Sequence, residues 1–132
     1  MNAQPLLVAD GLTRRYGSVV ALDDVTLEVR DGITGLLGEN GAGKSTAIRT
    51  FLGLLAPTSG TVRVLGKDPM TDLDVRSRLG YMPQHDALPT QVSPPEFLTH
   101  MAEVSGLPPR AARIRAADTL RHTGLFEERY RA

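Results

Sequence analysis

The residues best suited to chemistry lie in one run, from position 38 to position 46. The run reads GENGAGKST, and its first eight letters follow the pattern of a glycine, four residues, a glycine, a lysine and a serine or threonine. Glycines permit backbone angles that are closed to other residues, so successive N–H groups can turn inward around phosphate oxygens. The pattern therefore predicts a phosphate-binding loop formed by Gly38, Glu39, Asn40, Gly41, Ala42, Gly43, Lys44, Ser45 and Thr46.

The polar side chains at the end of this run have distinct predicted tasks. Lys44 can reach the β and γ phosphates of a nucleotide, and the hydroxyl of Ser45 can ligate Mg²⁺. Thr46 offers a further hydroxyl and N–H to the α-phosphate side. The N-terminus of the helix that follows adds its partial positive charge. We therefore expect Mg-ATP at this loop, with Ser45 as a metal ligand.

The elements around the loop distinguish this interpretation from an ordinary glycine-rich turn. Residues 33–37 are nearly all apolar, which predicts a strand covered on both faces by helices. After the loop, apolar residues recur at helical spacing as far as Leu55, and Pro57 stops the pattern. We expect this helix to be largely buried. A strand, the loop and a helix in this order are the context that the motif requires.

Alternation of apolar and polar residues predicts further strands elsewhere. Residues 25–29 and 61–64 alternate with a period of two, as expected of half-buried strands in an antiparallel sheet with one wet face. Residues 6–10 are four apolar residues and then Asp10, followed by Gly11. We interpret this segment as an edge strand that enters a turn.

The last third of the chain predicts helices. Ser93 is a candidate N-cap, Pro94 suits the first helical position, and Glu96 completes a capping box. The apolar face of this helix is Phe97, Leu98, Met101 and Val104, with Gly106 at its end. Residues 109–123 are rich in alanine and arginine, which predicts a surface helix closed by Gly124.

Three motifs in register carry a resemblance to a known family. The run GENGAGKST, the preceding RRYG with Tyr16 and the later LGYMPQ with Gln84 resemble the P-loop, the adenine-stacking aromatic and the Q-loop of ABC-type ATPases, in the family's order. The resemblance extends from about Leu7 to the C-terminus. NGAGKST followed by SGTVRVLG and YMPQ is most similar to subunits that serve exporters of drugs, polysaccharides or similar cargo.

The resemblance implies roles for two residues outside the loop. It implies that Tyr16 stacks on adenine, and that Gln84 reaches Mg²⁺ and the attacking water while transmitting the nucleotide state to a transmembrane partner. Taken alone, Tyr16 is as well explained as a turn or core aromatic. Taken alone, Gln84 is a polar residue at the end of a strand.

The family pattern continues beyond what the 132 residues contain. A signature loop of the LSGGQ type, a Walker B strand ending in Asp-Glu, a D-loop and a switch histidine are absent from the sequence. Residues 6–10 mimic a Walker B strand but precede the loop, and we give them no catalytic role. His85, His100 and His122 match the switch histidine by residue type only. Because hydrolysis needs groups that orient water and stabilise the transferring phosphoryl, we expect binding to survive better than turnover, and we predict no catalytic residue.

Composition limits the partners and the location. Fifteen basic and fifteen acidic residues cancel, which gives no electrostatic reason to expect nucleic acid. The chain has no cysteine, which fits a reducing compartment, and it shows neither a signal peptide nor an apolar run of the ~18 residues that cross a bilayer. We therefore expect a cytoplasmic chain, held at the membrane by a permease partner.

The sequence as a whole predicts an α/β fold that is one partial ABC-type ATP-binding domain over residues 1–132. Its parts are an N-terminal antiparallel β-subdomain, a P-loop NTPase core and the start of an α-helical subdomain, truncated before the signature loop. The resemblance implies ATP and Mg²⁺ as cofactors, and a transmembrane permease and a second ATP-binding subunit as partners. The alternative is a vestigial nucleotide-binding fragment without a transport role. A P-loop kinase or GTPase fits less well, because no guanine-reading Asn-Lys-x-Asp occurs.

Overall fold

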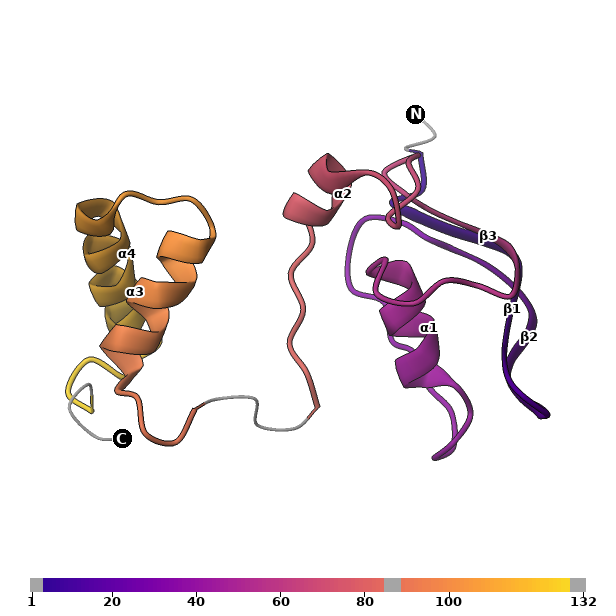
Figure 1. Cartoon of the computed structure of the whole chain (residues 1–132), viewed down its shortest axis with the longest axis horizontal. Coiled ribbons are helices and arrows are strands. Elements are labelled where there is room, and N and C mark those ends of the chain that lie inside the picture. The colour runs from indigo at the N-terminus through magenta and orange to yellow at the C-terminus, as the bar shows by residue number, and fades with distance from the viewer. Residues whose placement is uncertain (1–3, 85–88, 129–132) are drawn as a thin grey trace. The chain divides into compact units, whose positions relative to one another are not determined.

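The computed structural model describes residues 4–84 and 89–128, which form two compact units. The first unit is Met1–Met82 and the second is Pro83–Ala132. In Figure 1 the first unit holds the strands and the helices α1 and α2, and the second holds α3 and α4.

The first unit contains a three-stranded antiparallel sheet. Its strands are β1 (Leu7–Tyr16), β2 (Val19–Val29) and β3 (Ser59–Val64), in the order β2-β1-β3. The predicted antiparallel strands 25–29 and 61–64 are confirmed as parts of β2 and β3. The predicted edge strand at residues 6–10 is wrong, because β1 lies in the middle of the sheet and continues through Gly11 to Tyr16. The register shifts at Gly11, which has φ 57° and donates its N–H to the hydroxyl of Thr26 at 3.0 Å, and the strand continues past this irregularity.

A tight hairpin and an irregular register shape the end of β1. Tyr16 pairs with Val19, which leaves a two-residue turn with Gly17 at φ 58°. Arg14 pairs with Leu22, whereas Arg15 pairs with Val20. Ala21 is therefore an extra residue on β2, and such a bulge bends the strand and re-aims its neighbours.

Helix α1 (Lys44–Phe51) lies against one face of this sheet (Figure 1). The buried core unites residues of the sheet, α1 and α2: Ala9, Leu12, Leu22, Ala47, Val62, Val64 and Val75. The helix is shorter and less buried than the apolar spacing predicts. It ends at Phe51, two residues before Gly53 with φ 68°, and Ile48 and Leu54 are exposed.

The strand predicted at residues 33–37 is absent from the part of the chain that the structure describes. Ile33 and Leu37 are almost fully exposed, at 104% and 93%, and the segment has no strand assignment. A strand needs a neighbour that accepts its backbone hydrogen bonds, and the described strands pair only with one another. An apolar composition alone is not sufficient to make this segment a strand.

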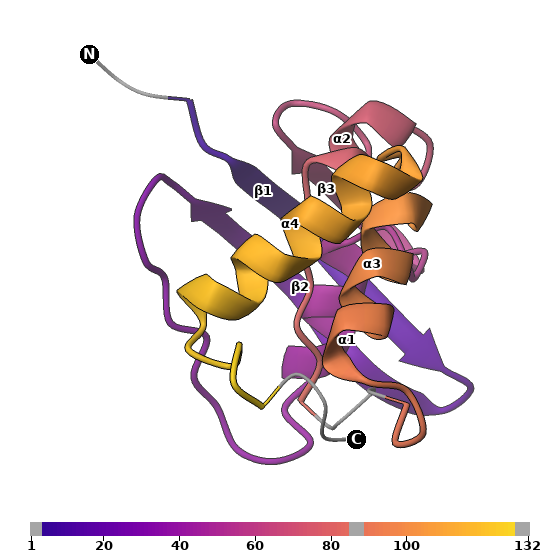
Figure 2. The ribbon, with the colours of Figure 1, turned by 90° about the vertical axis from the view of Figure 1, so that its left-hand side faces the viewer.

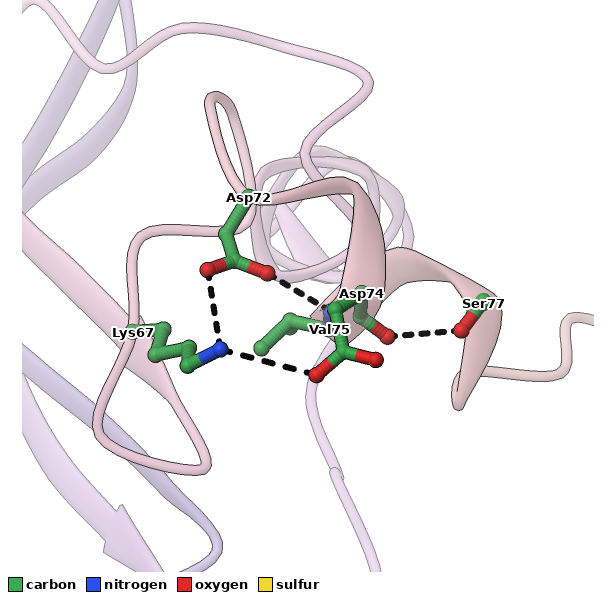
Figure 3. A network of polar contacts seen from close by, with 5 residues as sticks. All are labelled: Lys67, Asp72, Asp74, Val75 and Ser77. Carbon is green, nitrogen blue, oxygen red and sulfur yellow. Dashed lines mark hydrogen bonds and ion pairs between the residues drawn. The ribbon is translucent and has the colours of Figure 1, made fainter.

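A short helix that the sequence did not predict, α2 (Leu73–Ser77), follows the sheet. Asp72 caps it by accepting a hydrogen bond from the N–H of Val75 at 2.9 Å. Lys67 donates to Asp72 at 3.1 Å and to Asp74 at 3.5 Å, so one ammonium group joins the turn after β3 to the start of α2 (Figure 3). Val75 is buried in the core, and this polar network fixes the helix that carries it.

The second unit consists of α3 (Pro94–Val104) and α4 (Pro109–His122), which pack side by side (Figures 1 and 2). The predicted start of α3 is confirmed: the N–H and the hydroxyl of Ser93 donate to Glu96 Oε2 at 3.0 and 2.6 Å. Both helices end just before the predicted glycines, Gly106 and Gly124, which have positive φ. Helix α4 buries Ala112, Ala116 and Leu120, one residue on each successive turn.

Among the described residues, no helix has the length and apolar character to span a membrane.

Candidate functional site

The predicted phosphate-binding loop leads directly into the N-terminus of α1. Gly41 and Gly43 have φ of 85° and 89°, the left-handed region that glycine adopts without strain. The N–H of Ala42 donates to the carbonyl of Glu39 at 3.2 Å, which curls the loop. Gly38 to Ala42 are exposed, so the loop is open to a ligand.

The start of α1 is suited to an anion. The first N–H groups of a helix have no acceptor within the helix. Among the described residues, no side chain caps α1, and its first turn contains no acidic residue. The partial positive charge of the helix end is therefore not compensated by the protein, which favours a negatively charged ligand there.

Lys44 folds back over the loop. Its ammonium nitrogen donates to the carbonyl oxygens of Gly38 and Glu39, both at 2.6 Å. The side chain thus bridges the first residues of the loop to the first residue of α1. This position places a positive charge across the loop, where phosphate oxygens can replace the two carbonyl acceptors.

Strand β2 packs closely against the end of the loop at Gly43. A Cβ atom at Gly43 would collide with the carbonyl oxygen of Ala21, the extra residue of the bulge, and would lie 3.0 Å from Leu22 Cδ2. Leu22 is itself in the core, together with Ala47 of α1. The loop therefore rests against the bulged part of β2 with no room for a side chain at Gly43.

Tyr16, the last residue of β1, lies near the loop because it pairs with β2, the strand that the loop contacts. It pairs with Val19, two residues from Ala21 along β2, which corresponds to about 7 Å of strand. Tyr16 is 45% exposed. The structure thus brings Tyr16 and the loop to one end of the β1–β2 hairpin, within the first unit.

Gln84 belongs to the second unit and is exposed, whereas Lys44 and Tyr16 belong to the first. His100 and His122 are exposed on α3 and α4, and the ring Nδ1 of His122 lies 2.7 Å from the backbone carbonyl of Asp118. Both are therefore solvent-exposed residues of helices. His85 lies outside the described residues.

The donors around the loop decide which metal it could hold. Within residues 4–84 and 89–128, no three histidine or acidic side chains gather into a metal site. A Mg²⁺ ion prefers oxygen ligands and keeps several waters, so one hydroxyl together with phosphate oxygens can hold it. Ser45 is exposed at the start of α1 and fits that limited role.

A separate hollow of about 510 Å³ lies in the second unit, between α3 and α4. Phe97, Leu98, Leu120 and Leu125 are among its lining residues, and none of the residues around it is charged. A triphosphate needs cationic and N–H donors, so this hollow does not suit a nucleotide.

Sequence reasoning missed the residues that hold Tyr16. Arg14 lies over its ring, with the guanidinium carbon 4.8 Å from the ring centroid. Thr58 links β1 to the segment before β3, because its N–H donates to Thr13 O at 2.8 Å and its hydroxyl accepts from the N–H of Arg15 at 3.0 Å. A signal for Arg14 is present in the sequence: a cationic residue two positions before an aromatic one in a strand.

The comparisons with known proteins agree with this geometry. A family model described as ABC transporter matches residues 22–132, and the chain belongs to that family. The Nod factor export ATP-binding protein I of Ralstonia nicotianae is 38% identical over an alignment of 129 residues that covers 96% of this chain and 38% of that protein. The daunorubicin/doxorubicin resistance ATP-binding protein DrrA of Streptomyces peucetius is 38% identical over an alignment of 135 residues that covers 99% of this chain and 41% of that protein.

A solved structure extends the likeness to the fold. The chain resembles cbiO1 from Clostridium perfringens, described as part of the ABC transporter complex cbiONQ, with a TM-score of 0.78 and 25% identity. The match covers 96% of this chain and 53% of that one. The predicted α/β fold, with a P-loop NTPase core and an antiparallel β-subdomain, is confirmed. The chain spans about two fifths of the two curated relatives and about half of the solved chain.

Proposed function

We propose that the chain binds Mg-ATP through residues 38–46, as part of the ATP-binding subunit of an ABC transporter. The observation that carries this proposal is the start of α1, where an uncapped helix end follows two left-handed glycines and Lys44 crosses the loop. Members of the ABC ATPase family bind ATP with Mg²⁺, which supports the same assignment.

Each residue of the loop has a proposed task. The backbone N–H groups from Gly41 to Thr46 bind phosphate oxygens, and Lys44 exchanges its two carbonyl acceptors for the β and γ phosphates. Ser45 ligates Mg²⁺, while Thr46 contacts the α-phosphate side. The role of Mg²⁺ in this site is to offset the charge of the triphosphate.

Tyr16 and Gln84 complete the proposed site. Tyr16 stacks on the adenine base, and its nearness to the loop through β2 supports this role. Gln84 contacts Mg²⁺ and the attacking water, the role that the resemblance of YMPQ to the Q-loop implies. We also propose that residues 1–132 are one partial ATP-binding domain, in which the second unit is the start of the α-helical subdomain.

We do not assign hydrolysis to residues 1–132 alone. The sequence contains no Walker B Asp-Glu pair and no signature loop, and the described residues near the loop offer no carboxylate cluster. Ground-state binding groups without groups specific to the transition state support binding without turnover. We propose that the catalytic groups come from outside these residues in the working transporter.

The proposed partners are a transmembrane permease and a second ATP-binding subunit, with the chain at the cytoplasmic face of the membrane. One relative is named as part of a transporter complex and another as an export protein, which supports the permease and the exporter assignment. The balanced charge of the chain supports no role in nucleic-acid binding.

Calorimetry on the full chain tests the proposal. Mg-ATP and Mg-tripolyphosphate should both bind, whereas adenosine should bind far more weakly, because the loop contacts phosphates. Binding of adenosine as tight as that of Mg-ATP would refute a phosphate-directed site.

A further inference from the structure

We propose that Arg14 positions the ring of Tyr16 for the base of the nucleotide. The inference rests on the proposed ATP-binding function and adds to it a positioning role for Arg14, the first residue of the RRYG motif, to which the resemblance assigns no role. It is carried by two contacts of the Arg14 side chain, with the carbonyl oxygen of Ala56 and with the ring of Tyr16.

The guanidinium of Arg14 is anchored on one side and stacked on the other. Its Nη1 donates to the carbonyl oxygen of Ala56 at 2.8 Å. Its central carbon lies 4.8 Å from the centroid of the Tyr16 ring, within the range of a cation–π interaction. The guanidinium therefore joins the end of β1 to the segment that follows α1.

The anchor of Arg14 is itself held in place. Ala56 precedes Pro57, and a residue before proline is restricted to extended conformations. Two residues further on, Thr58 forms hydrogen bonds with the backbone of Thr13 and Arg15 on both sides of Arg14. The carbonyl that accepts from Arg14 is thus fixed relative to the strand that carries Tyr16.

The burial of Arg14 Nε indicates that this arrangement carries a cost in free energy. Its Nε is buried and has no hydrogen-bond partner among the described residues. An unsatisfied buried donor is unfavourable, particularly on a charged group. The compensating interactions in the structure are the bond to Ala56 and the contact with the Tyr16 ring.

This geometry orders the aromatic ring before a ligand arrives. The cation lies over the ring, and 45% of Tyr16 remains exposed, which leaves ring surface for the base to stack on. Fixing a side chain in its binding conformation reduces the entropy lost on binding. The contribution of Arg14 is therefore specific to ligands that carry a base.

The test compares Mg-ATP with Mg-tripolyphosphate by calorimetry on the full chain. The variant Arg14→Met keeps the apolar stem but removes the charge and the donors, and Arg14→Lys keeps the charge. Arg14→Met should weaken Mg-ATP binding roughly two- to fivefold, which corresponds to a cation–π contact at a partly exposed site, and should leave Mg-tripolyphosphate unchanged. Arg14→Lys should recover part of the loss.

Two controls separate positioning from a structural effect. Arg15→Met removes the same charge from the next position, where the side chain is exposed, and should change neither affinity. On a Tyr16→Ala background, Arg14→Met should cause no further loss of Mg-ATP affinity, because Arg14 acts through the ring. A melting curve of each variant confirms that it is folded at the titration temperature.

The outcomes distinguish this inference from the proposed function. Equal loss for both ligands, no loss for either, or a further loss on the Tyr16→Ala background would overturn the positioning role of Arg14. Failure of the phosphate site would instead appear as weak binding of Mg-tripolyphosphate to the unchanged chain.

Discussion

The Cα atom of Gly43 lies so close to the carbonyl oxygen of Ala21 that no side chain fits between them. Ala21 is the extra residue of the bulge in β2, and Gly43 is the N-cap of α1 with φ 89°. The bulge and the glycine together bring the helix N-terminus down onto the hairpin that carries Tyr16. The loop proposed to bind the phosphates and the ring proposed to bind the base thus both lie against strand β2.

Substitution of Gly43 should therefore be more harmful than substitution of Gly41. Gly41 has a similar φ of 85°, but a Cβ there would meet nothing within 4 Å. Gly41→Ala should cost about 1 to 2 kcal/mol of stability for a left-handed alanine. Gly43→Ala should cost more, because the collision with Ala21 is added to the same strain. Urea unfolding followed by circular dichroism measures both, and equal losses would show that the contact with Ala21 is unimportant.

Acid should lower the stability of both units, because each contains one carboxylate with a lowered pKa: Asp72 in the first and Glu96 in the second. The N–H of Val75, followed by the side chain of Lys67, holds the pKa of Asp72 below its ordinary value. The hydroxyl and the N–H of Ser93 do the same for the pKa of Glu96. A carboxylate with a lowered folded pKa contributes stability above its unfolded pKa and loses it as the pH falls through the folded pKa. We expect this loss to begin near pH 4 and to continue below it.

The variants Asp72→Asn and Glu96→Gln test this dependence, because each removes a charge and retains a side-chain acceptor. Their melting temperatures should lie below that of the unchanged chain at about pH 6 and approach it at about pH 3. A constant gap across this range would contradict the assignment. Lys67 has a raised pKa through Asp72, so its contribution should be present from about pH 4, above which the carboxylate is ionised, and should disappear above about pH 10.

Removal of Mg²⁺ should reveal the role of Ser45. In the unchanged chain Mg²⁺ should strengthen ATP binding, and in Ser45→Ala most of this gain should be lost, roughly tenfold in affinity. With EDTA present, the two proteins should bind ATP equally well, because the hydroxyl then has no ion to ligate. Calorimetry with and without Mg²⁺ measures both values. An unchanged Mg²⁺ gain in Ser45→Ala would remove Ser45 from the metal site.

Tyr16 should contribute to ATP binding through the face of its aromatic ring and not through its hydroxyl. Tyr16→Ala should weaken ATP binding by roughly 1 to 3 kcal/mol, the range for a base stacked on an aromatic ring, whereas Tyr16→Phe should cost little. GTP should bind with a modest penalty, because stacking reads no hydrogen-bond edge of the base. If Tyr16 is only structural, the alanine variant will melt at a lower temperature and keep its relative affinities for ATP and tripolyphosphate.

Local signals in the sequence predicted local structure well. The capping box of Ser93 and Glu96 lies within four residues of sequence and marks the start of α3. The alternation of apolar and polar residues in 25–29 and 61–64 correctly predicted strands of one antiparallel sheet. The order of glycines, Lys44 and Ser45 likewise predicted a loop that leads into a helix. Each of these patterns acts over a short stretch of chain.

Features that depend on distant residues were predicted less well. The apolar run 33–37 is exposed because no described strand pairs with it, and pairing cannot be read from composition. The central place of β1 depends on β3, which follows more than 40 residues later. Arg14 was missed because its anchor, Ala56, lies 42 residues away.

The central claim, that the loop at residues 38–46 binds nucleotide phosphates, is tested most directly by one titration. The chain has two lysines, so Lys44→Ala can be compared with Lys67→Ala, which removes the same charge from the turn after β3. By calorimetry with Mg-ATP, Lys44→Ala should weaken binding roughly tenfold to a hundredfold, as expected for loss of a charged hydrogen-bonding group. Lys67→Ala should leave the affinity unchanged. An unaltered dissociation constant in Lys44→Ala, measured on a protein that still folds, would contradict the assignment of this loop.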